Sequence, residues 1–174
     1  ARHRGAARLA AELDVAMLNG NDGEITDLAG DDAEVRGVES VGEYSDIATT
    51  AVACAQTHDT VVVASGETDI VATADAAYEV TAGHPQMGTV VGTGCMLGGS
   101  LATLAGATED ATQAALAGTV AFGLAGEAAA AGEFGDVHGP GSYNVAFKDA
   151  VAGLRGTDHD AADTRIERVL KAGE

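Results

Sequence analysis

The stretch from residue 90 to residue 100 (VVGTGCMLGGS) constrains this chain more than any other part of the sequence. Two β-branched residues run into a glycine turn and then an apolar segment, which predicts a strand or loop that feeds the N-terminus of a buried helix. A helix N-terminus exposes unpaired main-chain amides and a partial positive charge, and both attract anions. Gly92 and Gly94 let the backbone approach a ligand closely, and Cys95 adds a reactive thiol. The segment predicts an anion site suited to phosphoryl transfer, although a tight turn before a core cysteine has the same pattern.

The composition excludes several classes of partner. Of the 174 residues, 46% are hydrophobic but only 3% are aromatic, so alanine and valine must carry the packing of a single-domain core. The formal net charge is −18, from 27 acidic and 9 basic residues, and the sequence has no basic patch for nucleic acid or an anionic membrane surface. An acidic excess spread along the chain resembles proteins from salt-loving organisms, because salt screens the self-repulsion. Abundant, patterned apolar residues exclude a disordered acidic protein.

The location that we expect is the cytoplasm. Two cysteines, Cys54 and Cys95, form no disulfide framework, which favours a reducing compartment. The first residues lack the apolar core of a signal peptide. The uncharged segment 112–126 is shorter than the ~20 apolar residues that a membrane span requires, so it predicts a buried helix instead.

Strand and helix patterns alternate along the first half of the chain, and helical patterns dominate the second half. Apolar or alternating runs predict strands at 15–18, 60–64, 70–74 and 77–81, with the last two as a hairpin. Helical periodicity predicts helices at 4–13, 21–28, 45–57, 93–105, 109–131 and 141–154, with a loop at 30–42. Residues 1–154 are therefore expected to form one α/β layered domain with a mostly parallel sheet. Residues 155–174 form a polar acidic tail, in which we expect a helix at 160–171.

Asn21 and Glu24 place an amide and a carboxylate one helical turn apart, where a loop meets a helix. Such oxygen ligands suit a hydrated Mg²⁺ ion. The alternative is a helix cap with an acidic first turn, which is the commoner origin of this pattern.

Ser65 and Gly66 follow a buried strand at its carboxyl end, where open α/β sheets place their ligands. The Ser65 hydroxyl and the neighbouring amides are candidates for contact with a nucleotide phosphate. The alternative is a plain turn.

Several short motifs occur in a fixed order along the chain. They are NDGE at 21–24, GVES at 37–40, SGETD at 65–69, GHP at 83–85, GTGC at 92–95 and GPGS at 139–142. Together they resemble the hydroxyethylthiazole kinase family, from the start of the chain to about Leu154, with an acidic composition of the haloarchaeal type. The resemblance implies the ribokinase-like α/β fold. The chain resembles the C-terminal portion of that fold, so its N-terminal part, including an acidic metal-site residue, is expected to be missing here.

The resemblance implies an enzyme that phosphorylates the hydroxyethyl side chain of a thiazole, with ATP and Mg²⁺, in thiamine salvage. By this likeness Gly92, Thr93 and Gly94 form an anion hole around the transferring phosphate, and Gly92 also touches the substrate. Cys95 becomes the catalytic residue that accepts the alcohol proton or orients the hydroxyl. The family forms trimers with sites at subunit interfaces, so a homotrimer is implied.

The likeness also assigns the ATP and metal contacts. Asn19 and Ser65 would contact ATP, and Asn21 and Glu24 would hold Mg²⁺ and its waters. Asn19 replaces the basic residue that the family usually has, which removes a positive charge from the phosphate site, and Ser65 stands where threonine is frequent.

Other functions compete with this one. A catalytically impaired relative would bind nucleotide or thiazole without turnover, and another ribokinase-like kinase would favour aspartate at position 95. A dinucleotide-binding site is disfavoured because its glycine fingerprint belongs after the first strand of a βαβ unit. A P-loop is excluded because no Gly-Lys-Ser/Thr sequence occurs. His84 precedes the glycine turn without an assigned role, and the other histidines lack metal-ligand spacing.

Overall fold

The computed structural model describes residues 2–30, 43–154 and 164–171. Its helices are α1 (Arg2–Glu12), α2 (Asp22–Ala29), α4 (Glu43–His58), α5 (Thr93–Ala105), α6 (Ala111–Ala130) and α7 (Pro140–Ala152), with a 3-10 helix η1 (Pro85–Thr89). Its strands are β1 (Met17–Asn21), β2 (Val61–Ser65), β3 (Asp69–Ala72), β4 (Ala76–Val80) and β5 (Ile166–Lys171). The loop expected at 30–42 lies almost wholly outside the described residues.

The strands form one sheet in the order β1-β2-β3-β4-β5. Only β1 and β2 run parallel, and the three other neighbouring pairs are antiparallel. The expectation of a mostly parallel sheet is therefore wrong for the described strands, while the hairpin of β3 and β4 is confirmed. The connections from Ser65 to Asp69 and from Ala72 to Ala76 are the physical reason, because a parallel return needs a crossover of about a dozen residues.

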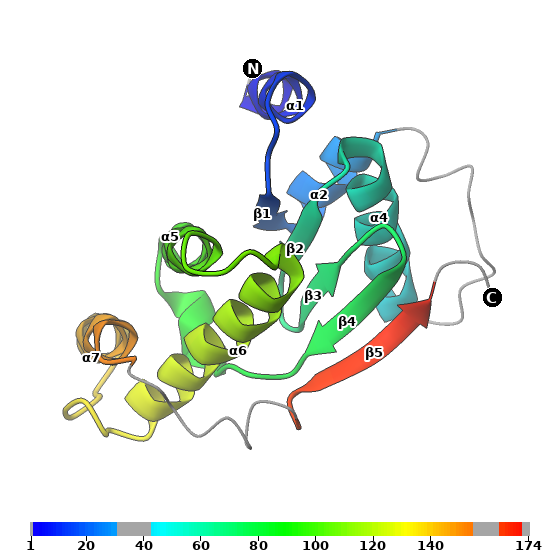
Figure 1. Ribbon diagram of the computed structural model, residues 1–174. Coiled ribbons are helices and arrows are strands. Elements are labelled where there is room, and N and C mark those ends of the chain that lie inside the picture. The colour runs from blue at the N-terminus through cyan, green and yellow to red at the C-terminus, as the bar shows by residue number, and fades with distance from the viewer. Residues whose placement is uncertain (1, 31–42, 155–163, 172–174) are drawn as a thin grey trace.

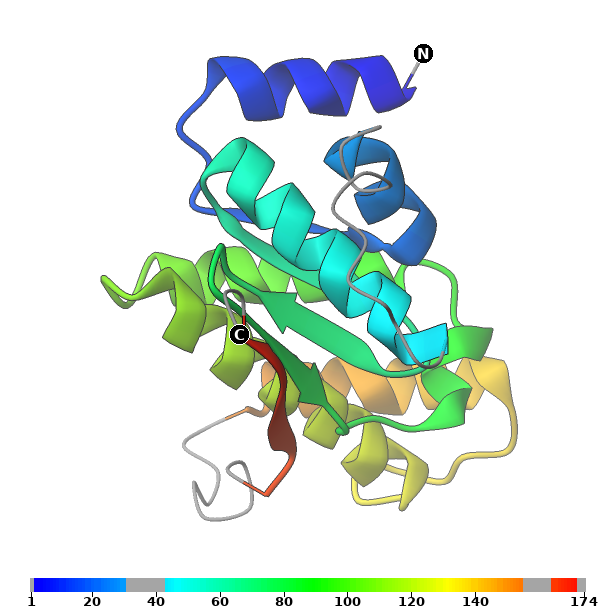
Figure 2. The ribbon, with the colours of Figure 1, turned by 90° about the vertical axis from the view of Figure 1, so that its right-hand side faces the viewer.

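Helices cover both faces of this sheet, so the layered α/β architecture is confirmed (Figure 1 and Figure 2). Helices α2 and α4 pack on one face, and α5 and α6 pack on the other, with α7 against α6. Strand β2 shows why both faces need cover. Val62 and Ala64 belong to the core under α4, whereas Val61 and Val63 belong to the core under α6. No described helix is long and apolar enough to cross a bilayer.

The C-terminal residues extend the sheet instead of adding a helix. Residues 166–171 form β5, which pairs antiparallel with β4, so the helix expected at 160–171 is wrong over that part. As an edge strand, β5 is largely exposed and carries Glu167, Arg168 and Lys171. Charged residues protect an edge strand from pairing with other chains. The same charges make the segment look like a solvated helix in the sequence.

Small residues bring α6 close to the segment that follows β4. A Cβ atom added at Gly123 would lie 2.5 Å from the carbonyl carbon and oxygen of Ala82. Phe122 meets Phe147 of α7 edge to face, with 5.0 Å between the ring centroids, and Tyr143 stacks on Phe147. Much of the chain's scarce aromatic surface thus supports the segment beside Ala82.

Candidate functional site

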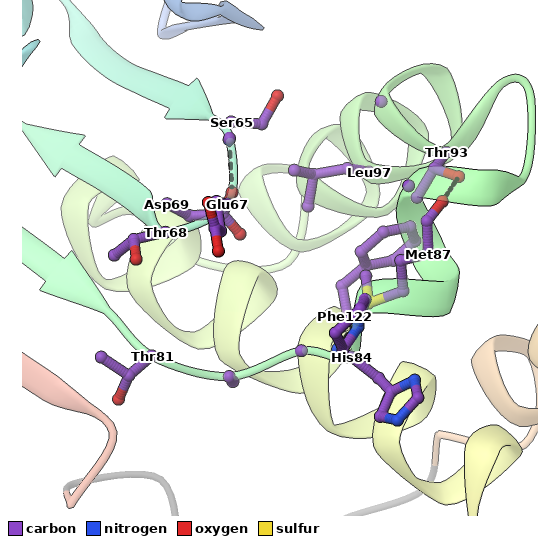
Figure 3. A pocket seen from close by; sticks show the side chains of 16 residues that line it. Ser65, Glu67, Thr68, Asp69, Thr81, His84, Met87, Thr93, Leu97 and Phe122 are labelled. Atoms are coloured by element: carbon purple, nitrogen blue, oxygen red, sulfur yellow. Dashed lines mark hydrogen bonds between the residues drawn. The ribbon is translucent and has the colours of Figure 1, made fainter.

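Three segments converge on a cavity of about 730 Å³ (Figure 3). The first is the turn at 65–69 between β2 and β3, and the second is the segment 81–88 that follows β4. The third is the first turn of α5, where Thr93, Gly94 and Leu97 line the space. The sequence motifs at 65–69, 83–85 and 92–95 thus meet at one place. The site lies by the carboxyl ends of the parallel strands β1 and β2, as expected for an open α/β sheet.

The N-terminus of α5 presents main-chain amides at this cavity. Gly92 is the N-cap residue and has φ 96°, a left-handed conformation that favours glycine. The first turn-closing bond runs from the Met96 amide to the Gly92 carbonyl at 3.0 Å. Within the described chain, no acceptor contacts the amides of Thr93, Gly94 and Cys95. Unpaired donors and a helix dipole are features that favour an anion at such a turn.

Thr93 fixes this turn through its side chain. Its hydroxyl lies 2.9 Å from the Met87 carbonyl oxygen (Figure 3) and 2.8 Å from that of Val90. The Thr93 side chain therefore stabilises the turn, and the main-chain amides at 93–95 keep their hydrogen-bonding capacity for a ligand.

Asn19 of β1 reaches the same turn. Its Nδ2 donates to the Gly94 carbonyl oxygen at 3.2 Å, and a Cβ atom at Gly98 would lie 3.3 Å from that Nδ2. The amide thus ties β1 to the first turns of α5. Asn19 does not line the cavity, so its expected contact with ATP stays a prediction.

The two cysteines differ in their surroundings. Cys54 is fully buried, and burial raises the pKa of its thiol to about 11, so it behaves as a core residue. Cys95 is exposed in the first turn of α5. It does not line the cavity, although Thr93, Gly94 and Leu97 on either side of it in the chain do, so its catalytic role stays a prediction.

Asn21 and Glu24 form a complete capping box at the start of α2. The Asn21 Oδ1 atom accepts from the Glu24 amide at 2.9 Å, and the Glu24 Oε2 atom accepts from the Asn21 amide at 3.0 Å. The cap that the sequence offered as the alternative is therefore present. Glu24 Oε1 has no such bond within the described residues. No group of three metal-ligating side chains occurs among those residues.

Ser65 lines the cavity, but its hydroxyl is directed to β1. The Oγ atom donates to the Gly20 carbonyl oxygen at 3.2 Å. The neighbouring Gly66 lies close to α2, because a Cβ atom there would be 3.4 Å from Asp22 Oδ1. The turn after β2 and the start of α2 therefore form one continuous rim.

Asp69 is the strongest electrostatic feature of that rim, and the sequence motif contained it without giving it a role. Its Oδ1 atom accepts from the Gly66 amide at 3.1 Å. Burial raises the pKa of Asp69 to about 6, against the lowering effect of the Gly66 bond, and the nearby Asp22 charge raises it further. Burial also raises the pKa of Asp22. An ionised Asp69 therefore costs folding free energy.

We expect Asp69→Asn to remove a step in the dependence of stability on pH. The folded pKa is about 6 and the ordinary value is 3.8, so the folded state holds its proton more tightly and stability falls as pH rises between these values. Above pH 6 the variant should be more stable than the parent by up to about 3 kcal/mol, since Asn keeps an acceptor for the Gly66 amide. Urea unfolding from pH 4 to 8 measures the difference, with Asp75→Asn in the exposed β3–β4 turn as control. Parallel curves for parent and Asp69→Asn would contradict this assignment.

Two charged residues beside the cavity carry no signal in the sequence. Glu127 of α6 and Arg165 before β5 form an ion pair at 2.9 Å and both contact the segment that follows β4. They stand 38 residues apart, and neither belongs to a motif. His84 lines the cavity, and its Nδ1 atom accepts from the Gln86 amide at 3.3 Å, which caps η1.

Comparisons with known proteins show the family of the chain. Residues 1–156 match the family model described as the hydroxyethylthiazole kinase family. A relative named hydroxyethylthiazole kinase from Natronomonas pharaonis is 68% identical over 171 residues, which cover 97% of this chain and 60% of the relative. A second relative named hydroxyethylthiazole kinase, from Haloquadratum walsbyi, is 57% identical over 174 residues, and the match covers 59% of that relative. The chain thus spans about three-fifths of the length of these curated relatives.

A solved structure gives independent support for the fold. The hydroxyethylthiazole kinase protein from Pyrococcus horikoshii superposes with a TM-score of 0.75 at 24% sequence identity, over 97% of this chain and 60% of that one. This confirms the layered α/β fold that the resemblance implied.

Proposed function

This chain belongs to the hydroxyethylthiazole kinase family, and from that premise we propose that it carries the phosphoryl-transfer site of an ATP- and Mg²⁺-dependent kinase. The acceptor would be the alcohol of hydroxyethylthiazole, and the reaction would serve thiamine salvage. The observation that carries the proposal is the first turn of α5, whose unpaired amides open onto the cavity between the turn at 65–69 and the segment 81–88. Developing negative charge on a transferring phosphoryl group needs such preorganised donors.

In this proposal the main chain of Gly92, Thr93 and Gly94 forms the anion hole. The left-handed Gly92 starts the turn, and the Thr93 hydroxyl holds it by two bonds to carbonyl oxygens. Gly92 is also proposed to touch the acceptor alcohol; it is exposed next to the lining residues Thr93 and Gly94 but does not itself line the cavity. The anion hole is therefore preorganised before a ligand arrives.

Cys95 is the proposed catalytic residue. Its thiol is exposed in the same first turn of α5 as Thr93 and Gly94, which line the cavity, so an acceptor alcohol bound at that turn would lie near it. The sulfur would accept the alcohol proton or orient the oxygen for in-line attack.

Mg²⁺ would be held next to the turn at 65–69. The fit is adequate because Mg²⁺ usually binds through one or two carboxylates together with substrate phosphates and water. Glu24 offers its Oε1 atom, and Asn21 orients that carboxylate through the capping box. When bound, the ion would neutralise phosphate charge. Asn19 and Ser65 are proposed to contact ATP, Ser65 through its place in the cavity wall.

We further propose a cytoplasmic homotrimer adapted to high salt. The net charge of −18 supports a salt-rich solvent, in which self-repulsion is screened. Leu9 and Leu13 on or beside α1 have exposed fractions of 59% and 58%, which supports burial in an assembly. Nucleic acid and membranes are not proposed partners, given the acidic composition.

Transfer of labelled γ-phosphate from ATP to hydroxyethylthiazole tests the proposal. We expect product formation that depends on Mg²⁺, with much slower transfer to sugar and pyrimidine alcohols. ATP binding without transfer would instead favour a nucleotide-binding protein that has lost catalysis. That alternative is worth testing because Asn19 stands where the hydroxyethylthiazole kinase family usually has a basic residue, so a positive charge is missing from the proposed phosphate site. Absence of both binding and transfer would overturn the assignment.

A further inference from the structure

We infer that Glu127 and Arg165 form a clamp that holds one wall of the cavity, residues 81–83, and thereby sets the affinity for the nucleotide. The inference concerns two positioning residues and rests on the proposed function for the identity of the ligand. Arg165 lies outside residues 1–156, which the family model matches, so the shared motifs do not account for it.

The two side chains meet in a two-pronged ion pair. Arg165 Nη2 lies 2.9 Å from Glu127 Oε2, and Nη1 lies 3.1 Å from Oε1. The side chains are only 35% and 29% exposed. A bidentate pair of arginine and carboxylate fixes orientation as well as distance, and partial burial limits its screening by salt. The pair is therefore suited to hold a neighbouring main-chain segment in place.

What it holds is the main chain that lines the cavity. Arg165 Nη1 donates to the Thr81 carbonyl oxygen at 3.0 Å, and Glu127 Oε1 accepts from the Gly83 amide at 3.0 Å. The Thr81 amide also donates to the Arg165 carbonyl oxygen at 3.0 Å. The clamp thus grips the wall on both sides of Ala82, and each of these wall residues lines the cavity.

The wall needs this support because of its backbone. Gly83 has φ 142°, a conformation that other residues rarely adopt, and the chain leaves β4 just before it. The wall also packs against α6, where Ala82 lies close to Gly123, one helical turn before Glu127. Without the two side chains, packing against Gly123 and the main-chain bond from Thr81 to Arg165 would remain, but the Gly83 amide would lose its acceptor and the Thr81 carbonyl its donor.

Ser65, at the end of β2, lies on the opposite side of the cavity from this wall (Figure 3), whereas Thr68 lies beside Thr81, in line with the pairing of Asp69 with Val80. A displaced wall would change the width of the cavity and so the contacts of a bound nucleotide. The amides at the start of α5 are braced separately, by Thr93. We therefore expect the clamp to affect nucleotide binding much more than the rate of transfer.

The test compares Arg165→Ala, Arg165→Lys and Glu127→Gln in the full-length protein at high salt. We expect the alanine and glutamine variants to raise the KM for Mg-ATP about tenfold while kcat stays within about twofold, in line with the loss of a charge-assisted hydrogen-bond network. Arg165→Lys should recover part of the affinity, because it keeps the charge but not the fork. Combining Arg165→Ala with Glu127→Gln should add little to either change alone.

Local amide exchange separates the clamp from a general loss of stability. The Gly83 amide should exchange faster in a Glu127→Ala protein, which removes its acceptor, while amides inside α4 keep their protection. Arg168→Ala is the matched control: it removes another arginine from the same edge, at 5.9 Å from the Tyr78 ring and away from the wall, and should change neither KM nor Gly83 exchange.

Unchanged KM in folded Arg165→Ala, or unchanged Gly83 exchange in Glu127→Ala, would overturn the inference. A parent protein that transfers no phosphate would count against the proposed function only. Gly83 exchange would still decide whether the clamp exists, because that measurement needs no substrate.

Discussion

Gly123→Ala is expected to lower the free energy of unfolding by about 2–3 kcal/mol and to weaken nucleotide binding. The new methyl group would lie 2.5 Å from the Ala82 carbonyl carbon and oxygen and 2.7 Å from the Ala82 Cβ atom. These are main-chain and Cβ atoms, so no rotamer change relieves the overlap and either α6 or the cavity wall must shift. The gain in helix propensity, at most about 1 kcal/mol, is smaller than the overlap cost.

Thermal unfolding and titration with Mg-ATP measure the two effects of Gly123→Ala. Gly99→Ala is a matched control in the interior of α5, where an added Cβ meets nothing within 4 Å. The control should be neutral or up to about 1 kcal/mol more stable, because alanine favours the helix. If the Gly123→Ala protein were as stable as the Gly99→Ala protein, α6 would not pack tightly against Ala82 in the cavity wall.

Cys95→Ala is expected to lower kcat by about 10²–10⁴, the range typical for a group that transfers a proton in the transition state. Stability should barely change, because Cys95 is exposed in the first turn of α5. The KM for ATP should also change little, since the phosphate would contact main-chain amides and the sulfur would face the acceptor alcohol.

Steady-state kinetics with hydroxyethylthiazole and ATP measure the Cys95 effect. Cys54→Ala is the control for loss of a thiol: it should lower stability, because Cys54 is fully buried, and leave kcat unchanged. Normal turnover by Cys95→Ala would remove the catalytic role and leave the anion hole as the sole catalytic element of the described chain.

Local patterns predicted most of the helices. Helix α5 begins and ends at the expected residues 93 and 105, and α6 and α7 differ from the expected bounds by one or two residues. The N-cap at Asn21 and the hairpin of β3 and β4 follow the expected chemistry as well. These features depend on neighbours in the chain, which a sequence displays directly.

Features that depend on distant segments escaped prediction. The sheet was expected to be mostly parallel because strands alternate with helices early in the chain, yet the turns that join β2, β3 and β4 are too short for crossovers. Residues 166–171 look helical by polarity, but pairing with β4 decides their structure. Glu127 and Arg165 meet only because α6 and β5 flank the same segment.

The position of Arg165 has a consequence for biosynthesis. Every other residue of the clamp and of the cavity precedes it in the chain, so all of them leave the ribosome first. Segments of a nascent protein fold as they emerge, beginning with the N-terminal ones. A ribosome-bound chain that stops short of residue 165 would therefore have the α5 turn and strands β2–β4, while residues 81–83 of the cavity wall still lacked their contacts with Arg165.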